Sequence, residues 1–193
     1  MQLSRDAIIS AALHLLDSYG LPDVTMRRVA SSLNVAPGAL YWHVANKQEL
    51  IAAMAEAVLA PVGGTTPEEL ALSLRGELLR WRDGAEVAIA GLAHPDLNIG
   101  TTLDTACEEA FAAAVPGAPQ ASVRTASRTL IHSILGATYL AQSRAQLLEG
   151  NRESSLAADS PMDGATESPQ DGAAELHRTI DLLIAGLTAQ ASR

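Results

Sequence analysis

Residues 25–50 read TMRRVASSLNVAPGALYWHVANKQEL and predict two short helices joined by a tight turn, followed by the start of another helix. Thr25 can cap the first of these helices with its hydroxyl group. Asn34 ends it, because asparagine tolerates the left-handed backbone that a tight interhelical turn often needs. Pro37 suits the first turn of the next helix, where its missing N–H would have had no intrahelical partner.

Two helices of this size and order, about 25–33 and 37–43, are typical of a helix-turn-helix. Ala30 is small at the point where the two helices must cross closely, and Val35 and Leu40 supply the apolar underside. Many small helical domains share this pattern. An ordinary helical hairpin therefore remains an alternative on these residues alone.

The second of these helices has a distinctive outer face. Its leading residues are all small, namely Pro37, Gly38 and Ala39. Three rings follow in a row over residues 41–43, and because neighbouring helix positions lie ~100° apart, at least one ring must face solvent. Lys47, the only lysine of the chain, comes four residues later. Rings with polar tips and a nearby cation can hold phosphates, while small side chains let a helix approach base edges.

Helical spacing continues on both sides of this stretch, and clear strand patterns are absent. Before it, an apolar face predicts a helix over about 4–19, with Ser4 as its cap. After it, Asn46 and Glu49 have capping-box spacing and open a helix that ends at Pro61. Further helices are expected over about 67–83, 85–92, 102–115, 120–148 and 174–190. The predicted fold class is therefore all-α.

The breaks between these helices predict two domains. Residues 61–66 form a hinge between an N-terminal three-helix helix-turn-helix domain, 1–60, and a C-terminal helical domain for ligand binding and dimerisation, 61–193. Residues 150–174 are rich in Ser, Ala, Asp, Gly and Pro, so we expect them to form a mobile loop.

Composition limits the class of protein. The 193 residues are 48% apolar and 18% charged, so the chain can bury a core. No apolar run is long enough to span a membrane, the first residues are polar, and Cys107 has no partner cysteine. We therefore expect a cytoplasmic protein without a membrane partner.

The net charge of −9 at first argues against a nucleic acid partner. Residues 1–50, however, hold four basic and four acidic side chains, so all the excess negative charge lies in residues 51–193. This distribution permits an anion-binding N-terminal module on an acidic body.

Two segments carry a resemblance to a known family. Residues 40–44, Leu-Tyr-Trp-His-Val, with Asn46, Lys47 and Leu50, resemble the DNA-reading segment of the TetR family of repressors. Residues 25–30 resemble the second helix of that family. The resemblance covers residues 4–60 and is greatest to the tetracycline-repressor branch, in which Tyr-Trp-His-Val is typical. It implies a palindromic double-stranded DNA operator as partner.

The resemblance also implies a role for each residue of the motif. Thr25 would cap its helix and touch a phosphate, Arg27 would reach a base, and Arg28 would serve the DNA backbone or a salt bridge. Residues 37–39 occupy base-reading positions but can give only van der Waals contacts. The phosphate contacts implied are Tyr41, His43 and Lys47, with Trp42 either a further one or part of the core.

For the C-terminal domain the resemblance implies a homodimer through helices near 120–148 and 174–190, in which Gly136 and Gly186 would allow close helix approach. It also implies a cavity enclosed by the intervening helices. Each candidate lining residue has ordinary core packing as its alternative, and the candidates are Leu74, Leu78, Trp81, Leu103, Phe111, His132 and Tyr139.

The tetracycline-repressor branch holds a magnesium–drug chelate, and this sequence departs from it. Ala88 stands where that branch has its metal-binding histidine, and Leu140 aligns with its acidic residue. Leu70 and Leu74 align with the asparagine and phenylalanine that grip the drug. Alanine and leucine offer no ligands to a hard cation, so we expect no metal, no cofactor and a small apolar or aromatic effector.

Three functions stay open at this point. A ligand-responsive, dimeric transcriptional repressor is the leading hypothesis. A second is a DNA-binding regulator whose C-terminal body docks a protein partner. A third is a small helical enzyme, although no nucleophile–base pair, metal cluster or phosphate loop supports it.

Overall fold

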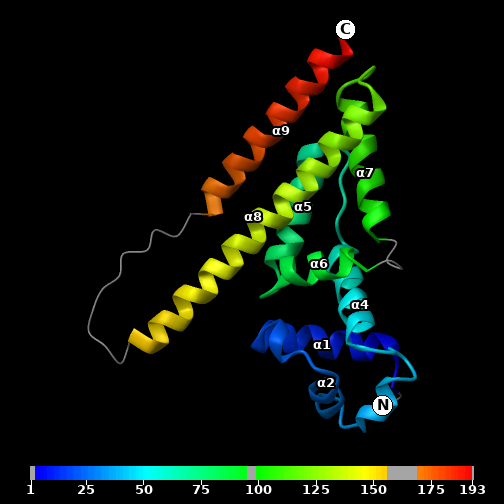
Figure 1. Ribbon diagram of the computed structural model, residues 1–193, viewed down its shortest axis with the longest axis vertical. Helices are drawn as coiled ribbons and strands as arrows, with labels where there is room; N and C mark the ends of the chain where they lie inside the picture. Colours follow the sequence, from blue (N-terminus) through cyan, green and yellow to red (C-terminus); the bar gives the residue numbers. More distant parts are fainter. Residues whose placement is uncertain (1–2, 95–98, 156–168, 193) are drawn as a thin grey trace.

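The computed structural model describes residues 3–94, 99–155 and 169–192, and in these ranges every regular element is a helix (Figure 1). The predicted all-α fold is confirmed. The elements in chain order are α1 (Arg5–Tyr19), the 3₁₀-helix η1 (Leu21–Asp23), α2 (Met26–Ser32), α3 (Pro37–Leu40), α4 (Lys47–Leu59), α5 (Pro67–Leu79), α6 (Gly84–Leu92), α7 (Ile99–Ala114), α8 (Gln120–Ser155) and α9 (Pro169–Ala191).

The helices begin at the capping residues that the sequence predicts. Ser4 Oγ accepts a hydrogen bond from the Ala7 N–H at 3.2 Å, and Thr25 Oγ1 accepts one from the Arg28 N–H at 3.2 Å. Thr66 and Glu69 form a complete capping box at the start of α5. Each cap satisfies an amide that has no partner within its own helix, which fixes where the helix starts.

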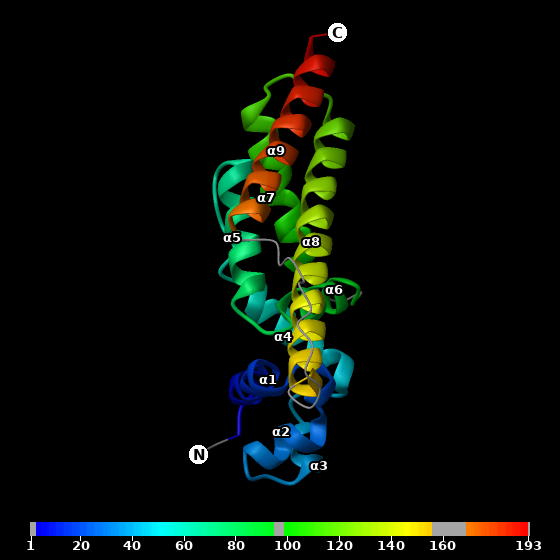
Figure 2. The same cartoon turned by 90° about the vertical axis from the view of Figure 1, so that its left-hand side faces the viewer.

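Helix α4 connects the N-terminal helices to the rest of the molecule. Leu50, Met54 and Val58 are fully buried along one face, as their helical spacing predicts. Figures 1 and 2 show α4 leading from α1 and α2 at one end of the molecule toward α6. The buried residues of both halves belong to one continuous apolar core. The predicted boundary at residues 60 and 61 therefore separates two halves that share a core.

Helices α8 and α9 run along one side of the body and are both longer than their predicted ranges (Figure 2). Helix α8 has 36 residues and continues through residues 150–155, and α9 already begins at residue 169. Both ends of the predicted loop 150–174 are thus helical. Its centre, 156–168, lies outside the described residues. Pro169 starts α9 at a position where proline costs no hydrogen bond.

An ion pair that the sequence does not reveal joins α9 to α5. His177 Nε2 lies 2.7 Å from Glu68 Oε1, although the two residues are far apart in the chain. The pKa of His177 is raised, mainly by its hydrogen bond to the Ala173 carbonyl and to a smaller extent by its hydrogen bond to Glu68.

Candidate DNA-binding surface, domain junction and pockets

The turn between α2 and α3 has the predicted geometry. Asn34 adopts a left-handed backbone, with φ of 54°, and the Val35 N–H donates to the Ala30 carbonyl at 3.0 Å. Ala30 and Leu40 are completely buried between the two helices. A tight turn of this kind requires a small residue at the crossing and an apolar residue beneath it, which the sequence supplies.

Helix α3 is shorter than expected. It ends at Leu40 instead of near residue 43, and the N–H groups of His43 and Val44 both donate to the Leu40 carbonyl at 2.9 Å. Residues 41–43 therefore form a turn that leads toward α4. The three rings are placed by this turn rather than by successive helix positions.

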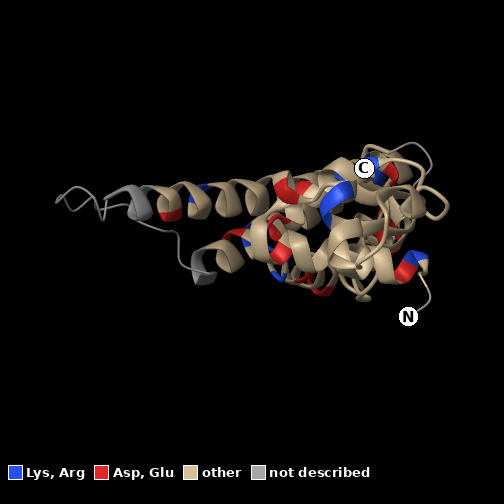
Figure 3. Ribbon diagram, turned by 90° about the horizontal axis from the view of Figure 1, so that it is seen from below, with Lys and Arg blue, Asp and Glu red and all other residues tan. Residues whose placement is uncertain are grey.

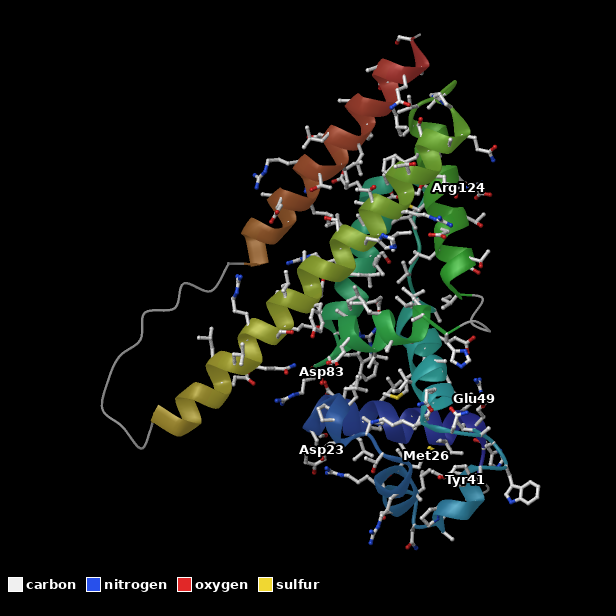
Figure 4. The ribbon with its side chains drawn as sticks, in the orientation of Figure 1. Asp23, Met26, Tyr41, Glu49, Asp83 and Arg124 are labelled. Carbon is white, nitrogen blue, oxygen red and sulfur yellow. The ribbon has the colours of Figure 1, made fainter. Side chains whose placement is uncertain are left out.

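All three rings lie at the surface. Trp42 is 89% exposed, Tyr41 is 53% exposed and His43 is also exposed. Core packing, the alternative for Trp42, is therefore excluded within the protomer. Figure 4 shows Tyr41 at the end of the molecule farthest from α9, beside α3. The three rings are therefore accessible to a partner molecule.

The two arginines of α2 have different surroundings. Arg27 is exposed, whereas Arg28 forms an ion pair with Asp23, and its guanidinium lies 4.5 Å from the centre of the Tyr19 ring. Of the two roles open for Arg28, the structure therefore shows the salt bridge. Arg27 stays the candidate for a base contact.

The small residues of α3 remain accessible. Pro37 and Gly38 are exposed, Ala39 is half-buried, and a side chain at Gly38 would meet no atom within 4 Å. Lys47, half-buried, is the first residue of α4. Figure 3 views the molecule from the α1–α3 end and shows acidic and basic segments interspersed. These features give a surface of small side chains, rings and scattered cations, which can hold phosphates and let α3 approach base edges.

The structure does not bring the seven predicted ligand residues together around one cavity. Leu74, Leu78 and Phe111 are core residues with almost no exposed surface. Trp81 lines a groove against α1, together with Leu13 and His14. Tyr139 is exposed on α8 because its side chain points out of the protomer.

Leu103 and His132 do share a groove. It lies between α6, α7 and α8, has a volume of about 440 Å³ and is lined mostly by apolar side chains such as Leu92 and Ile131. Among the positions aligned with the tetracycline site, Leu70, Leu74 and Ala88 are buried core, whereas Leu140 is 61% exposed. Contact of these residues with an effector stays a prediction.

The junction between the two halves contains a site that the sequence analysis missed. Asp83, only 3% exposed, accepts a hydrogen bond from the Leu21 N–H at 2.6 Å and another from the Gln146 side chain (Figure 4). The carboxylate thus joins the segment before α2 to helix α8. Gly20 is required beside it, because a Cβ there would lie 2.9 Å from Asp83 Oδ2 and its φ is +83°.

Helix α8 holds the same junction through a second amide. Gln142 Nε2 donates to the carbonyls of Leu78 at 3.1 Å and Trp81 at 2.8 Å, and its oxygen accepts from the Ala85 N–H at 3.1 Å. These bonds satisfy backbone groups at the end of α5 and the start of α6. The sequence carries no local signal for the Asp83 contacts, because Leu21 and Gln146 are both far from Asp83 in the chain.

Other chemistry-bearing residues form no cluster in the described part of the chain. No group of three or more His, Cys, Asp or Glu side chains there could hold a metal ion. Burial raises the pKa of the Cys107 thiol to about 11, so the thiol stays protonated at neutral pH. No described helix is both long and apolar enough to cross a membrane.

Comparison with known proteins agrees with this geometry. Residues 8–54, which include the helix-turn-helix, match the family described as bacterial regulatory proteins, tetR family. The class G tetracycline repressor of Vibrio anguillarum is 34% identical over 148 residues, covering 69% of each chain. The chain spans about half the length of other tetracycline repressors that it matches, such as 52% of one from Escherichia coli.

Two solved structures match almost the whole chain. BioQ with its double-stranded DNA operator is 34% identical with a TM-score of 0.72, covering 97% of this chain and 99% of BioQ. A single-residue variant of TetR from Acinetobacter baumannii AYE, in complex with minocycline, is 29% identical with a TM-score of 0.74, covering 100% of both chains. The exposed helix-turn-helix, the helical body and these relatives together show that the chain belongs to the TetR family of bacterial transcriptional regulators.

Proposed function

We propose that the protein is a ligand-responsive transcriptional repressor that binds a palindromic DNA operator as a dimer and acts by binding rather than by catalysis. The observation that carries the proposal is the helix-turn-helix with its rings and small residues uncovered at one end of the molecule. The structure of BioQ with its operator, a relative similar over nearly its whole length, supports DNA as the partner.

The long helices support dimerisation. Leu140 and Leu147 of α8 and Leu182 of α9 are large apolar side chains that are mostly exposed in the single chain. At Gly136 and Gly186 an added Cβ would meet no atom within 4 Å, so neither glycine is needed for packing inside one protomer. Burial of these faces against a second copy would remove apolar surface from water and give a two-fold dimer. A dimer can place two helix-turn-helix units on two half-sites.

The groove between α6, α7 and α8 supports a small apolar or aromatic effector. Leu103, Ile131 and Leu135 line it, and His132 and Asp104 are its polar groups. A pocket of this kind binds an apolar molecule and orients it through a few polar contacts. The Acinetobacter baumannii TetR variant in complex with minocycline is a related protein that holds a small molecule, which supports an effector of this kind.

Selection of genomic DNA fragments by the purified chain tests this function. A palindromic sequence should be enriched, and small molecules that release the bound fragment should then identify the effector class. The control is Gly38→Glu, which adds a negative charge to α3 where no atom lies within 4 Å, so the fold should remain. Equal enrichment by the parent and by Gly38→Glu would contradict the proposal.

A further inference from the structure

A second groove lies in the body, between α5, α8 and α9. Its volume is about 230 Å³. Its apolar walls include Leu79, Ile134 and Leu176, and the hydroxyl residues Ser133, Thr138 and Thr179 also line it. None of these residues lines the groove between α6, α7 and α8. The two grooves are therefore separate sites.

This second groove contains a half-buried cation. The Arg75 guanidinium lies against Gly172 of α9, so that a Cβ on Gly172 would stand 2.7 Å from Arg75 Nη2. The missing side chain of Gly172 gives the guanidinium its room. Among the side chains that the structure describes, no carboxylate lies within 4.0 Å of Arg75, and Glu175 at the edge of the groove is exposed.

A guanidinium in an apolar groove favours one kind of ligand. Its planar N–H groups match the two oxygens of a carboxylate, and hydrogen bonds between charged groups are stronger than those between neutral ones. The leucine and isoleucine side chains beside it favour a hydrocarbon body.

We propose that the groove between α5, α8 and α9 binds a small organic acid, whose carboxylate pairs with Arg75 and whose apolar body packs on Leu79, Ile134 and Leu176. The site does not depend on the proposed function, because ligand binding is measured on the free protein without DNA. It would make α9, a helix with exposed apolar side chains, responsive to a metabolite with an acid group.

Calorimetric titration at neutral pH with octanoate, and with octanamide as the uncharged equivalent, tests the site. The parent should bind octanoate about tenfold or more tightly than octanamide, because only the acid forms the charged pair. Arg75→Gln should remove this preference and leave octanamide binding unchanged. Arg80→Gln is the matched control, since exposed Arg80 caps the end of the same helix but pairs with Glu77 and does not line the groove.

A second variant distinguishes loss of the binding site from a loss of folding. Gly172→Ala places a methyl group where the guanidinium lies and should weaken octanoate binding while the circular dichroism spectrum stays the same. The proposal is overturned if octanoate does not bind the parent, if the acid and the amide bind equally, or if Arg75→Gln binds octanoate like the parent. Octanoate binding without release of DNA would contradict an effector role and leave the site intact.

Discussion

Lys47 combines three properties of a phosphate-contacting residue: it is the only lysine, it follows the exposed rings, and it opens α4 beside α3. We predict that Lys47→Ala weakens binding to every DNA sequence by a similar factor. Loss of one phosphate contact releases about one counterion fewer, so the plot of log affinity against log salt should become shallower by about one unit. Affinities measured over a series of salt concentrations check this, with exposed and uncharged Gln48→Ala as control. An unchanged slope would show that Lys47 does not reach the DNA.

Arg27 is expected to act on base preference instead. Because it is exposed on α2 and not held by the ion pair of Arg28, Arg27→Ala should relax the preference at one base position, at a cost of about 1–3 kcal/mol. Binding to a set of single-base operator variants measures this effect. Arg28→Ala, which breaks the pair with Asp23, should change stability slightly and keep the base preference. If the Arg27 variant discriminates bases like the parent, Arg27 contacts only phosphate or no DNA.

At the scale of helices, starts with a capping hydroxyl group were easier to predict than the other helix boundaries. Ser4, Thr25 and Thr66 cap helices because hydroxyl groups satisfy free amides locally, and local chemistry is visible in sequence. The ends of α3 and α8 differ from their predicted positions. Helix α3 ends early because the Leu40 carbonyl accepts two hydrogen bonds from the following turn. The extension of α8 over residues 150–155 was missed because these residues have no apolar residues at helical spacing. Asn46 Oδ1 accepts from the Glu49 N–H, but Glu49 reaches back to Ala45 instead of Asn46.

The candidate sites also differ in how far the sequence predicts them, because some depend on local sequence and others on packing. The helix-turn-helix is a local pattern, so its outer residues could be named from the sequence. The grooves depend on which apolar side chains pack against each other, and Leu74 and Phe111 proved to be core. Spacing alone does not distinguish a buried leucine from one that lines a cavity, because both lie on the inner face of a helix.

Asp83, the residue before α6, joins η1 to α8 through hydrogen bonds to Leu21 and Gln146. We predict that Asp83→Ala lowers the free energy of unfolding by about 1–3 kcal/mol, because the buried Leu21 N–H loses its acceptor. Hydrogen exchange of the Leu21 amide should become faster. The control is Asp104→Ala, which removes a more exposed ion pair with Arg128 and should cost about 0–1 kcal/mol. Unchanged exchange at Leu21 would mean that other contacts hold this junction.

For the whole molecule, the proposed dimer predicts that the exposed face of α9 is part of the interface. Leu182 is 74% exposed, so Leu182→Glu should leave the fold of one chain intact and convert the dimer to monomer. Sedimentation velocity measures the change, and circular dichroism checks the fold. Leu72→Glu, at an exposed leucine of α5, is the matched control and should stay dimeric. A dimer that survives the charge on α9 would require a different interface.

We also predict that magnesium–tetracycline does not bind. Ala88, Leu70 and Leu74 are buried apolar residues at the positions aligned with the drug site and provide no ligand for a hard cation. Calorimetry with tetracycline, with and without magnesium, should show no saturable heat for the parent. Magnesium-dependent binding at micromolar drug would contradict the prediction and indicate that other residues, such as His94, supply the ligands.

The chain has two tryptophans, and their fluorescence can report separately on the candidate DNA surface and on the junction. Trp42 stands in water at the candidate DNA surface, whereas Trp81 is half-buried in the groove against α1, next to the junction. An indole in water emits at longer wavelength than one packed among apolar groups. Quenching of the long-wavelength emission would therefore follow DNA engagement, and a shift of the shorter-wavelength component would follow movement at the junction. With Trp42→Phe and Trp81→Phe to separate the signals, the unlabelled protein can report whether the two events occur together or in sequence.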